Sequence, residues 1–226
     1  MANNLDLEEQ EQLDQLKHFW KQYGNWITWA LIVVLGVFAG WNFYQRWQQG
    51  QASQAAALYD ELERVANAGD ITKLDRVIGD MKEKFPATTY AHQAAFLSAK
   101  VYFEAGKIEQ SKASLSWVAE KSSDPGYQSI AKLRLASVLF ESKAYDEALK
   151  QLNGSFPDEF AALVADRKGD IFSMQGKKLE SIGEYERAYK AFGDQAEYRR
   201  LVEVKLNALG VNPRTDSGVV TTESKK

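Results

Sequence analysis

The stretch WITWALIVVLGVFAGWNFY, residues 26–44, decides the architecture of this chain. No Asp, Glu, Lys or Arg occurs between Lys21 and Arg46. A helix of this length, rising about 1.5 Å per residue, crosses a hydrocarbon layer about 30 Å thick. Amphipathic indoles prefer the level of the lipid headgroups, and five of the six tryptophans lie at the two ends of the stretch: Trp20, Trp26, Trp29, Trp41 and Trp47. The stretch therefore predicts a transmembrane helix.

Two alternatives to a transmembrane helix fit this stretch poorly. A buried helix of a soluble protein has no physical reason to carry tryptophan at both of its ends. A cleaved signal peptide should begin with a short basic segment, whereas residues 1–25 contain five acids and two lysines. Bulky residues also follow the apolar run, so no small-x-small cleavage pattern is present. We therefore expect an uncleaved signal anchor, preceded by an acidic tail over residues 1–25.

Basic residues on either side of the helix predict its orientation. Lys17 and Lys21 precede it and Arg46 alone follows it closely, so the positive-inside rule places the N-terminus in the cytoplasm by two residues to one. Within the helix, Gly36 and Gly40 form a GxxxG pair on one face. Such a pair lets a second helix approach closely, but glycine is also common in membrane helices that have no partner.

Residues 55–209 show helical periodicity throughout, with apolar residues three and four positions apart. Four helix-turn-helix units begin near residues 55, 92, 129 and 162, with periods of 37, 37 and 33 residues. The units superpose on the turns Ala68-Gly69-Asp70, Ala105-Gly106-Lys107, Lys143-Ala144-Tyr145 and Gln175-Gly176-Lys177. These periods bracket the repeat of about 34 residues that is typical of tetratricopeptide proteins.

Small residues occupy the expected helix crossings in the last three units. The eighth positions are Ala99, Ala136 and Gly169, and the twentieth positions are Ser111, Ala148 and Ser181. The first unit departs from the pattern, because Leu62 and Leu74 stand at these positions. A generic helical bundle with accidental spacing is the alternative to a repeat.

The predicted fold class is all-α: a single N-terminal transmembrane helix followed by a tetratricopeptide-like solenoid of about four helix pairs. A last amphipathic helix, residues 195–209, is expected to cap the stack and to end at Gly210. We expect residues 45–54 to be a juxtamembrane linker and the polar segment 210–226 to be a disordered tail.

The composition excludes several classes of function. The chain has no cysteine, and its two histidines, His18 and His92, lie too far apart in sequence for a zinc motif, so no metal site is expected. Beyond residue 25 the net charge is zero, which argues against nucleic acid as a partner. The segment GDIFSMQGKK, residues 169–178, has the wrong glycine spacing for a phosphate loop. Asp166 and Asp170 lie one helical turn apart, but they are interpreted as part of a solvated face. We expect no enzyme activity, no cofactor and no small-molecule substrate.

Several short stretches, in order and spacing, resemble the YfgM family of ancillary subunits of the bacterial SecYEG translocon. They are LKHFW at residues 16–20, GWNFY at 40–44, LRLA at 133–136 and AALVAD at 161–166. The resemblance implies a bacterial inner-membrane protein with a cytoplasmic N-terminus and a periplasmic repeat domain. It also implies two partners, the translocon and a membrane-anchored periplasmic chaperone of the prolyl-isomerase type. The family is further expected to pass emerging chains to periplasmic chaperones.

Three functions are compatible with this organisation. The first is a translocon-associated adaptor. The second is a membrane-tethered regulator whose cytoplasmic tail controls a soluble stress-response factor, because Leu5, Leu13, Leu16 and Trp20 lie near one helical face of that tail. The tail helix can equally lie in the membrane interface. The third is a scaffold for envelope protein assembly.

A binding surface is expected where the first helices of successive units line a concave groove. Positions five and twelve of the units carry Tyr59, Phe96, Phe103, Leu133 and Phe140, with Ala66, Asp166 and Ser173 completing the set. Lys100 and Glu104 stand beside the phenylalanines. Large apolar groups that face water usually mark a docking site, so these side chains are predicted to receive an apolar segment of a partner. The alternative is that the rings belong to the core.

Overall fold

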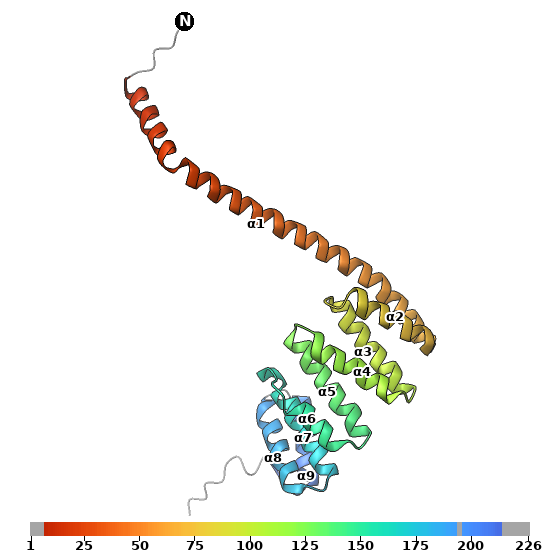
Figure 1. Ribbon diagram of the computed structural model, residues 1–226. Helices are drawn as coiled ribbons and strands as arrows, with labels where there is room; N and C mark the ends of the chain where they lie inside the picture. Colours follow the sequence, from red (N-terminus) through yellow and green to blue (C-terminus); the bar gives the residue numbers. More distant parts are fainter. Residues whose placement is uncertain (1–6, 194–195, 214–226) are drawn as a thin grey trace, which may run out of the picture. The chain divides into compact units, whose positions relative to one another are not determined.

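The computed structural model describes residues 7–193 and 196–213 (Figure 1). The chain divides into two compact units, Met1–Ser53 and Gln54–Lys226, which are described separately. All regular structure in the described residues is helical, with nine α-helices and one short 3-10 helix, which confirms the predicted all-α class. The expected disordered tail lies outside the described residues from position 214 onward.

The first unit consists of helix α1 (Leu7–Asn67) up to residue 53. Residues 26–44 of α1 are helical and, apart from the half-buried Ile27, their large apolar side chains are exposed, Trp26 by 78%. Among the described helices, α1 is the one long and apolar enough to cross a membrane. Residues 45–54, expected to be a linker, are also helical, so α1 runs from the apolar stretch into the repeat domain without a break.

The second unit begins with residues 54–67 of α1 and continues through eight more α-helices. These are α2 (Ile71–Lys84), α3 (Thr89–Glu104), α4 (Ile108–Lys121), α5 (Pro125–Glu141), α6 (Tyr145–Leu152), α7 (Ala161–Met174), α8 (Lys178–Ala191) and α9 (Ala196–Ala208), with the 3-10 helix η1 at Asp158–Phe160. From α2 onward each helix packs on the next along the chain, and the first helices of successive units also touch, α3 with α5 and α5 with α7. This is the arrangement of a helical-repeat stack, with α9 as the expected final helix (Figure 1).

The turns inside the helix pairs have one shared geometry. Gly69, Gly106 and Gly176 adopt φ angles of 69°, 71° and 72°, a left-handed conformation that glycine reaches without steric cost. In the third pair this position is held by Lys143, with φ 59°. The predicted turn Lys143-Ala144-Tyr145 is therefore centred one residue too late, whereas the predicted unit starts at 55, 92, 129 and 162 place Lys143 level with the three glycines. The error arose because glycine, which marks the position in the other turns, is absent.

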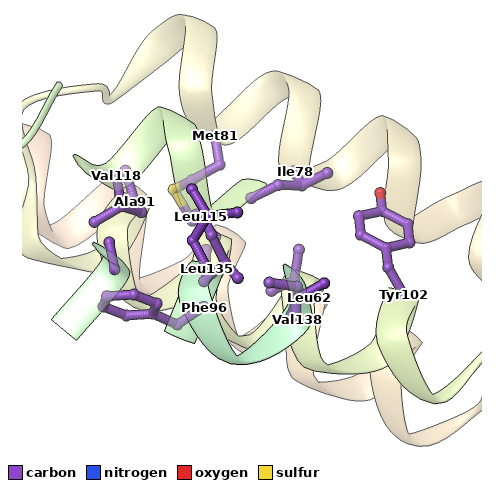
Figure 2. Close-up of a cluster of buried hydrophobic side chains, with 14 of the residues drawn as sticks. Leu62, Ile78, Met81, Ala91, Phe96, Tyr102, Leu115, Val118, Leu135 and Val138 are labelled. Atoms are coloured by element: carbon purple, nitrogen blue, oxygen red, sulfur yellow. The ribbon is translucent and has the colours of Figure 1, made fainter. Parts of the chain in front are cut away.

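The core runs between the paired helices (Figure 2). At two crossings the small residues meet as predicted: the Ser111 hydroxyl donates to the Ala99 carbonyl at 2.8 Å, and the Ser181 hydroxyl donates to the Gly169 carbonyl at 2.9 Å. In the first pair Leu62 and Leu74 are both fully buried. The departure of this unit from the repeat pattern is therefore a substitution of large apolar side chains for small ones inside the core.

Candidate docking groove

A groove of about 520 Å³ opens on the first helices of the second, third and fourth units. Its walls carry Phe96, Lys100 and Phe103 from α3, Arg134, Ser137 and Glu141 from α5, and Arg167 from α7. Ala99, Ser111, Leu115 and Val138 complete the lining. Because α3 packs on α5 and α5 on α7, side chains from three successive repeats meet in one surface. Such a surface suits an extended polypeptide better than a compact small molecule.

Three of the six predicted partner-binding residues, Phe96, Lys100 and Phe103, lie in this groove. The other three have different surroundings. The Tyr59 ring lies 5.9 Å from the Tyr90 ring, and the Phe140 ring lies 5.8 Å from the Tyr145 ring. Leu133 is half-buried and packs against the main core cluster.

The two phenylalanines of the groove differ in exposure. Phe96 is 8% exposed and belongs to the core cluster, where Figure 2 draws its ring among the buried side chains. Phe103 is 37% exposed and stands one helical turn beyond Lys100 on α3. Of the two rings, only Phe103 offers a large apolar surface to a partner, and Phe96 supports the wall behind it.

Two arginines in the groove were missed by sequence reasoning. The guanidinium of Arg134 lies 4.7 Å from the centre of the Phe96 ring, a cation–π contact. Arg167 lies one period of 33 residues further on, at the same position of the next unit, and its Nη1 is 3.5 Å from Asp170 Oδ2. The signal that would have found them is this repetition.

Glu141, which lines the groove, and Glu104, which lies beside it in the repeat, stand at the C-terminal ends of α5 and α3. Glu104 and Glu141 occupy the thirteenth position of the second and third units, seven residues after the sixth position that Arg134 holds. Glu104 lies near Lys100, with 3.8 Å between Oε1 and Nζ. The groove therefore has a basic end and an acidic end, with Phe103 and Lys100 between them.

A second polar cluster, beneath the capping helix, was misjudged from the sequence. Lys205 on α9 places Nζ 2.7 Å from Oδ1 of Asp166 and 2.7 Å from Oδ1 of Asp170, both on α7. The Tyr185 hydroxyl donates to Asp170 Oδ1 at 2.8 Å. Asp166 is buried, and that burial raises its pKa, although the Lys205 ammonium acts in the opposite direction. These carboxylates do not form a solvated face, because they fasten α9 to the fourth unit.

Neither histidine nor the glycine pair forms a recognisable site in the structure. Within residues 7–193 and 196–213 no group of three or more His, Asp or Glu side chains is arranged to hold a metal ion. His92 is buried between the Trp117 and Tyr127 rings, at 5.7 and 5.5 Å, and burial lowers its pKa. A methyl group at Gly36 or Gly40 would meet nothing within 4 Å among the described atoms, so packing of a second helix there stays a prediction.

Comparison with known proteins gives concordant results. A family profile described as "Tetratricopeptide repeat-like domain" matches residues 17–211. The chain is 31% identical over 204 residues to the "Ancillary SecYEG translocon subunit" of Neisseria gonorrhoeae, covering 90% of this chain and 98% of that protein. It is 32% identical over 203 residues to the protein of the same name from Haemophilus influenzae, with coverage of 90% and 98%. The Escherichia coli protein of that name is 26% identical over 206 residues, with coverage of 90% and 97%. No solved structure matches the chain.

Proposed function

This chain belongs to the tetratricopeptide repeat-like family that includes the ancillary SecYEG translocon subunits, and on that premise we propose that it is a membrane-anchored adaptor of the translocon. The observation that carries the proposal is the continuity of α1, which joins an apolar stretch of transmembrane length to the first helix of a repeat stack. Such a chain tethers a polypeptide-binding domain to the membrane. An adaptor working beside a protein-conducting channel needs this arrangement.

The finer proposal concerns direction and partners. The N-terminal tail, residues 1–25, lies in the cytoplasm, and the repeat domain lies in the periplasm of a bacterial inner membrane. The domain associates with a membrane-anchored periplasmic chaperone of the prolyl-isomerase type and helps pass newly translocated chains to periplasmic chaperones. Support comes from the two lysines before the apolar stretch, from the relatives named above and from the open groove on α3, α5 and α7.

Native purification tests the adaptor role. The full-length chain, carrying an affinity tag, is isolated from membranes solubilised in a mild detergent, and the co-purifying proteins are identified. We expect SecY, SecE and SecG to be recovered with this chain in a fixed ratio. The matched control is an unrelated tagged single-pass membrane protein of similar abundance. Recovery of the translocon at the level of that control would contradict the proposal.

A second candidate function is regulation of a soluble cytoplasmic factor. It is favoured by the N-terminal part of α1, where Leu13, Leu16 and Trp20 are exposed side chains of a helix. Deletion of residues 2–16 separates the two functions, because those residues lie on the far side of the apolar stretch from the repeat domain in sequence. An adaptor keeps its translocon partner after the deletion, whereas a regulator loses its soluble target.

A further inference from the structure

We propose that the groove on α3, α5 and α7 selects extended polypeptide segments in which a carboxylate and a large apolar side chain lie about three residues apart. The inference rests on the proposed adaptor function, since its occupant is a partner or client chain. The inference specifies which segments of such a chain bind in the groove. The argument depends on the order of charged and apolar groups along the groove.

The basic end of the groove is built by repetition. Arg134 and Arg167 hold the same position in the third and fourth units, and both line the groove. Two guanidinium groups from neighbouring helices suit a carboxylate, because each presents a planar fork of donors that matches its two oxygens. This end of the groove therefore attracts an acidic side chain.

Arg134 is the better placed of the two arginines. Its guanidinium lies on the Phe96 ring at 4.7 Å, and among the residues that the structure describes it has no ion-pair partner within 4.0 Å. Arg167 is partly engaged by Asp170, at 3.5 Å. A carboxylate entering the groove would therefore meet a cation that is already held in position but not neutralised.

The apolar part of the site lies further along the same helices. Phe103 is seven residues beyond Phe96 on α3, a distance of about 10 Å at about 1.5 Å per residue. An extended peptide advances about 3.3 Å per residue, so about three residues span this distance. The Phe103 ring, 37% exposed, then receives a large apolar side chain, with the buried Val138 in the groove lining.

The acidic end limits what else can bind. Glu141 lines the groove and Glu104 lies next to Phe103, so a continuous polyanion would meet repulsion there. Nucleic acid, which places a phosphate at every step, is therefore a poor occupant. A peptide with a carboxylate at one end and an apolar or basic residue at the other matches the order of basic, apolar and acidic side chains along the groove.

Fluorescence anisotropy of defined probes on the full-length chain in detergent micelles tests the inference. Each probe is a fluorescein-labelled, C-terminally amidated decapeptide of glycine and serine. The first carries Asp with Phe three residues later, the second carries Asn in place of Asp, and the third carries Lys in place of Asp. We expect the Asp probe to bind about tenfold more tightly than the Asn probe, since a hydrogen-bonded charged contact is lost. Lys should bind more weakly still, and added salt should reduce these differences.

Variants assign the preference to named side chains. Arg134→Glu should reverse the order, so that the Lys probe becomes the tightest, which loss of folding cannot produce. Phe103→Ala should weaken all three probes while leaving the melting temperature nearly unchanged. Arg76→Glu is the matched control, because Arg76 is an exposed arginine on α2 outside the groove. It should leave the order and the affinities as they are.

Several outcomes overturn the inference. They are equal affinity for the Asp and Asn probes, absence of binding for all three, and the same response to Arg134→Glu and Arg76→Glu. Concentration-dependent dimerisation that excludes the Asp probe would also overturn it, because the occupant would then be a second copy of this chain. If the probes fail while the translocon still co-purifies, only this inference is lost. If the Asp probe binds as expected while the translocon is absent, the groove preference stands and the adaptor role is lost.

Discussion

Gly169 sets the distance between α7 and α8 through the absence of a side chain. A methyl group at this position would lie 2.5 Å from two carbons of the Tyr185 ring. That ring is 4% exposed and is held by its hydrogen bond to Asp170, so it has little room to move away. We expect Gly169→Ala to overpack the crossing and to lower the free energy of unfolding by about 1–3 kcal/mol. The melting temperature of the full chain in detergent is the measurement.

Gly183→Ala is the matched control for that substitution. Gly183 lies on α8 in the same helix pair, is exposed, and has nothing within 4 Å of the methyl position. Replacing glycine by alanine inside an exposed helix usually adds about 0.5–1 kcal/mol of stability. The two Gly→Ala variants should therefore shift the melting temperature in opposite directions. A shift of the same sign and size in both would show that α7 and α8 do not cross at Gly169.

The Asp166–Lys205 pair predicts a pH dependence of stability. Burial raises the pKa of Asp166 above its ordinary value of 3.8, so the folded chain holds this proton to a higher pH than the unfolded chain does. The contribution of this group is therefore largest below pH 3.8, and it is lost as the pH rises through the folded pKa. Lys205 opposes the increase in the pKa of Asp166, because its ammonium group lies 2.7 Å from the carboxylate.

Lys205→Met removes this opposition and leaves the buried Asp166 carboxylate without its ion-pair partner, whereas Asp170 keeps Arg167 at 3.5 Å. We expect the variant to lose about 3 kcal/mol of stability at pH 7. The loss should shrink as the pH is lowered toward 4, because Asp166, whose pKa is raised by burial, takes up a proton. Denaturation between pH 4 and 7 measures it, with Lys190→Met as the control because Lys190 is exposed on α8. A loss in Lys205→Met that is independent of pH would contradict the role given to Asp166.

At the scale of elements, the sequence predicted helices well where local signals are strong. Gly69, Gly106 and Gly176 mark turns because their backbone geometry excludes most other residues. Lys143 takes the same geometry without that signal, and there the predicted turn was centred one residue too late, although the predicted unit starts are in register with it. The contact of Lys205 with Asp166 joins residues 39 positions apart on different helices, and no local pattern encodes such a contact.

The apolar part of α1 is the element that a single charge tests most directly. Val34 lies near the middle of the stretch, so Val34→Arg should cost about 3 kcal/mol of insertion free energy. We expect the fraction of the chain that resists extraction from membranes at alkaline pH to fall. Ala57→Arg places the same charge at an exposed position of α1 within the second unit and should leave that fraction unchanged. Equal retention of both variants would argue against a membrane-spanning helix.

At the scale of the whole molecule, the repeat explains which parts of the site were foreseeable. Phe96, Lys100 and Phe103 lie on one helix, so helical periodicity alone placed them together. The groove also needs Arg134 and Arg167, which reach it only because successive first helices pack side by side. Phe140 was expected at the equivalent of the Phe103 position, yet its ring lies against Tyr145 of its own helix pair. Periodicity gives a helix face, and the neighbouring repeat decides what that face meets.

The orientation of the chain in the membrane is the prediction that belongs to the whole molecule. Because the chain has no cysteine, a single introduced cysteine reports only on its own surroundings. Gln12→Cys lies before the apolar stretch and Lys121→Cys lies in the repeat domain, and both positions are exposed. With the N-terminus in the cytoplasm, a membrane-impermeant maleimide added to intact spheroplasts should label Lys121→Cys and leave Gln12→Cys unlabelled.

Disruption of the spheroplasts supplies the control, because both cysteines should then react to the same extent. Labelling of Gln12→Cys alone in intact spheroplasts would reverse the orientation and place the repeat domain in the cytoplasm. The physical basis of the expectation is a margin of one basic residue, Lys17 and Lys21 against Arg46. Arg46→Asp should therefore increase the preference for labelling Lys121→Cys over Gln12→Cys in intact spheroplasts. The double variant Lys17→Gln, Lys21→Gln should reduce that preference. Insensitivity of the pattern to both changes would mean that flanking charge does not orient α1.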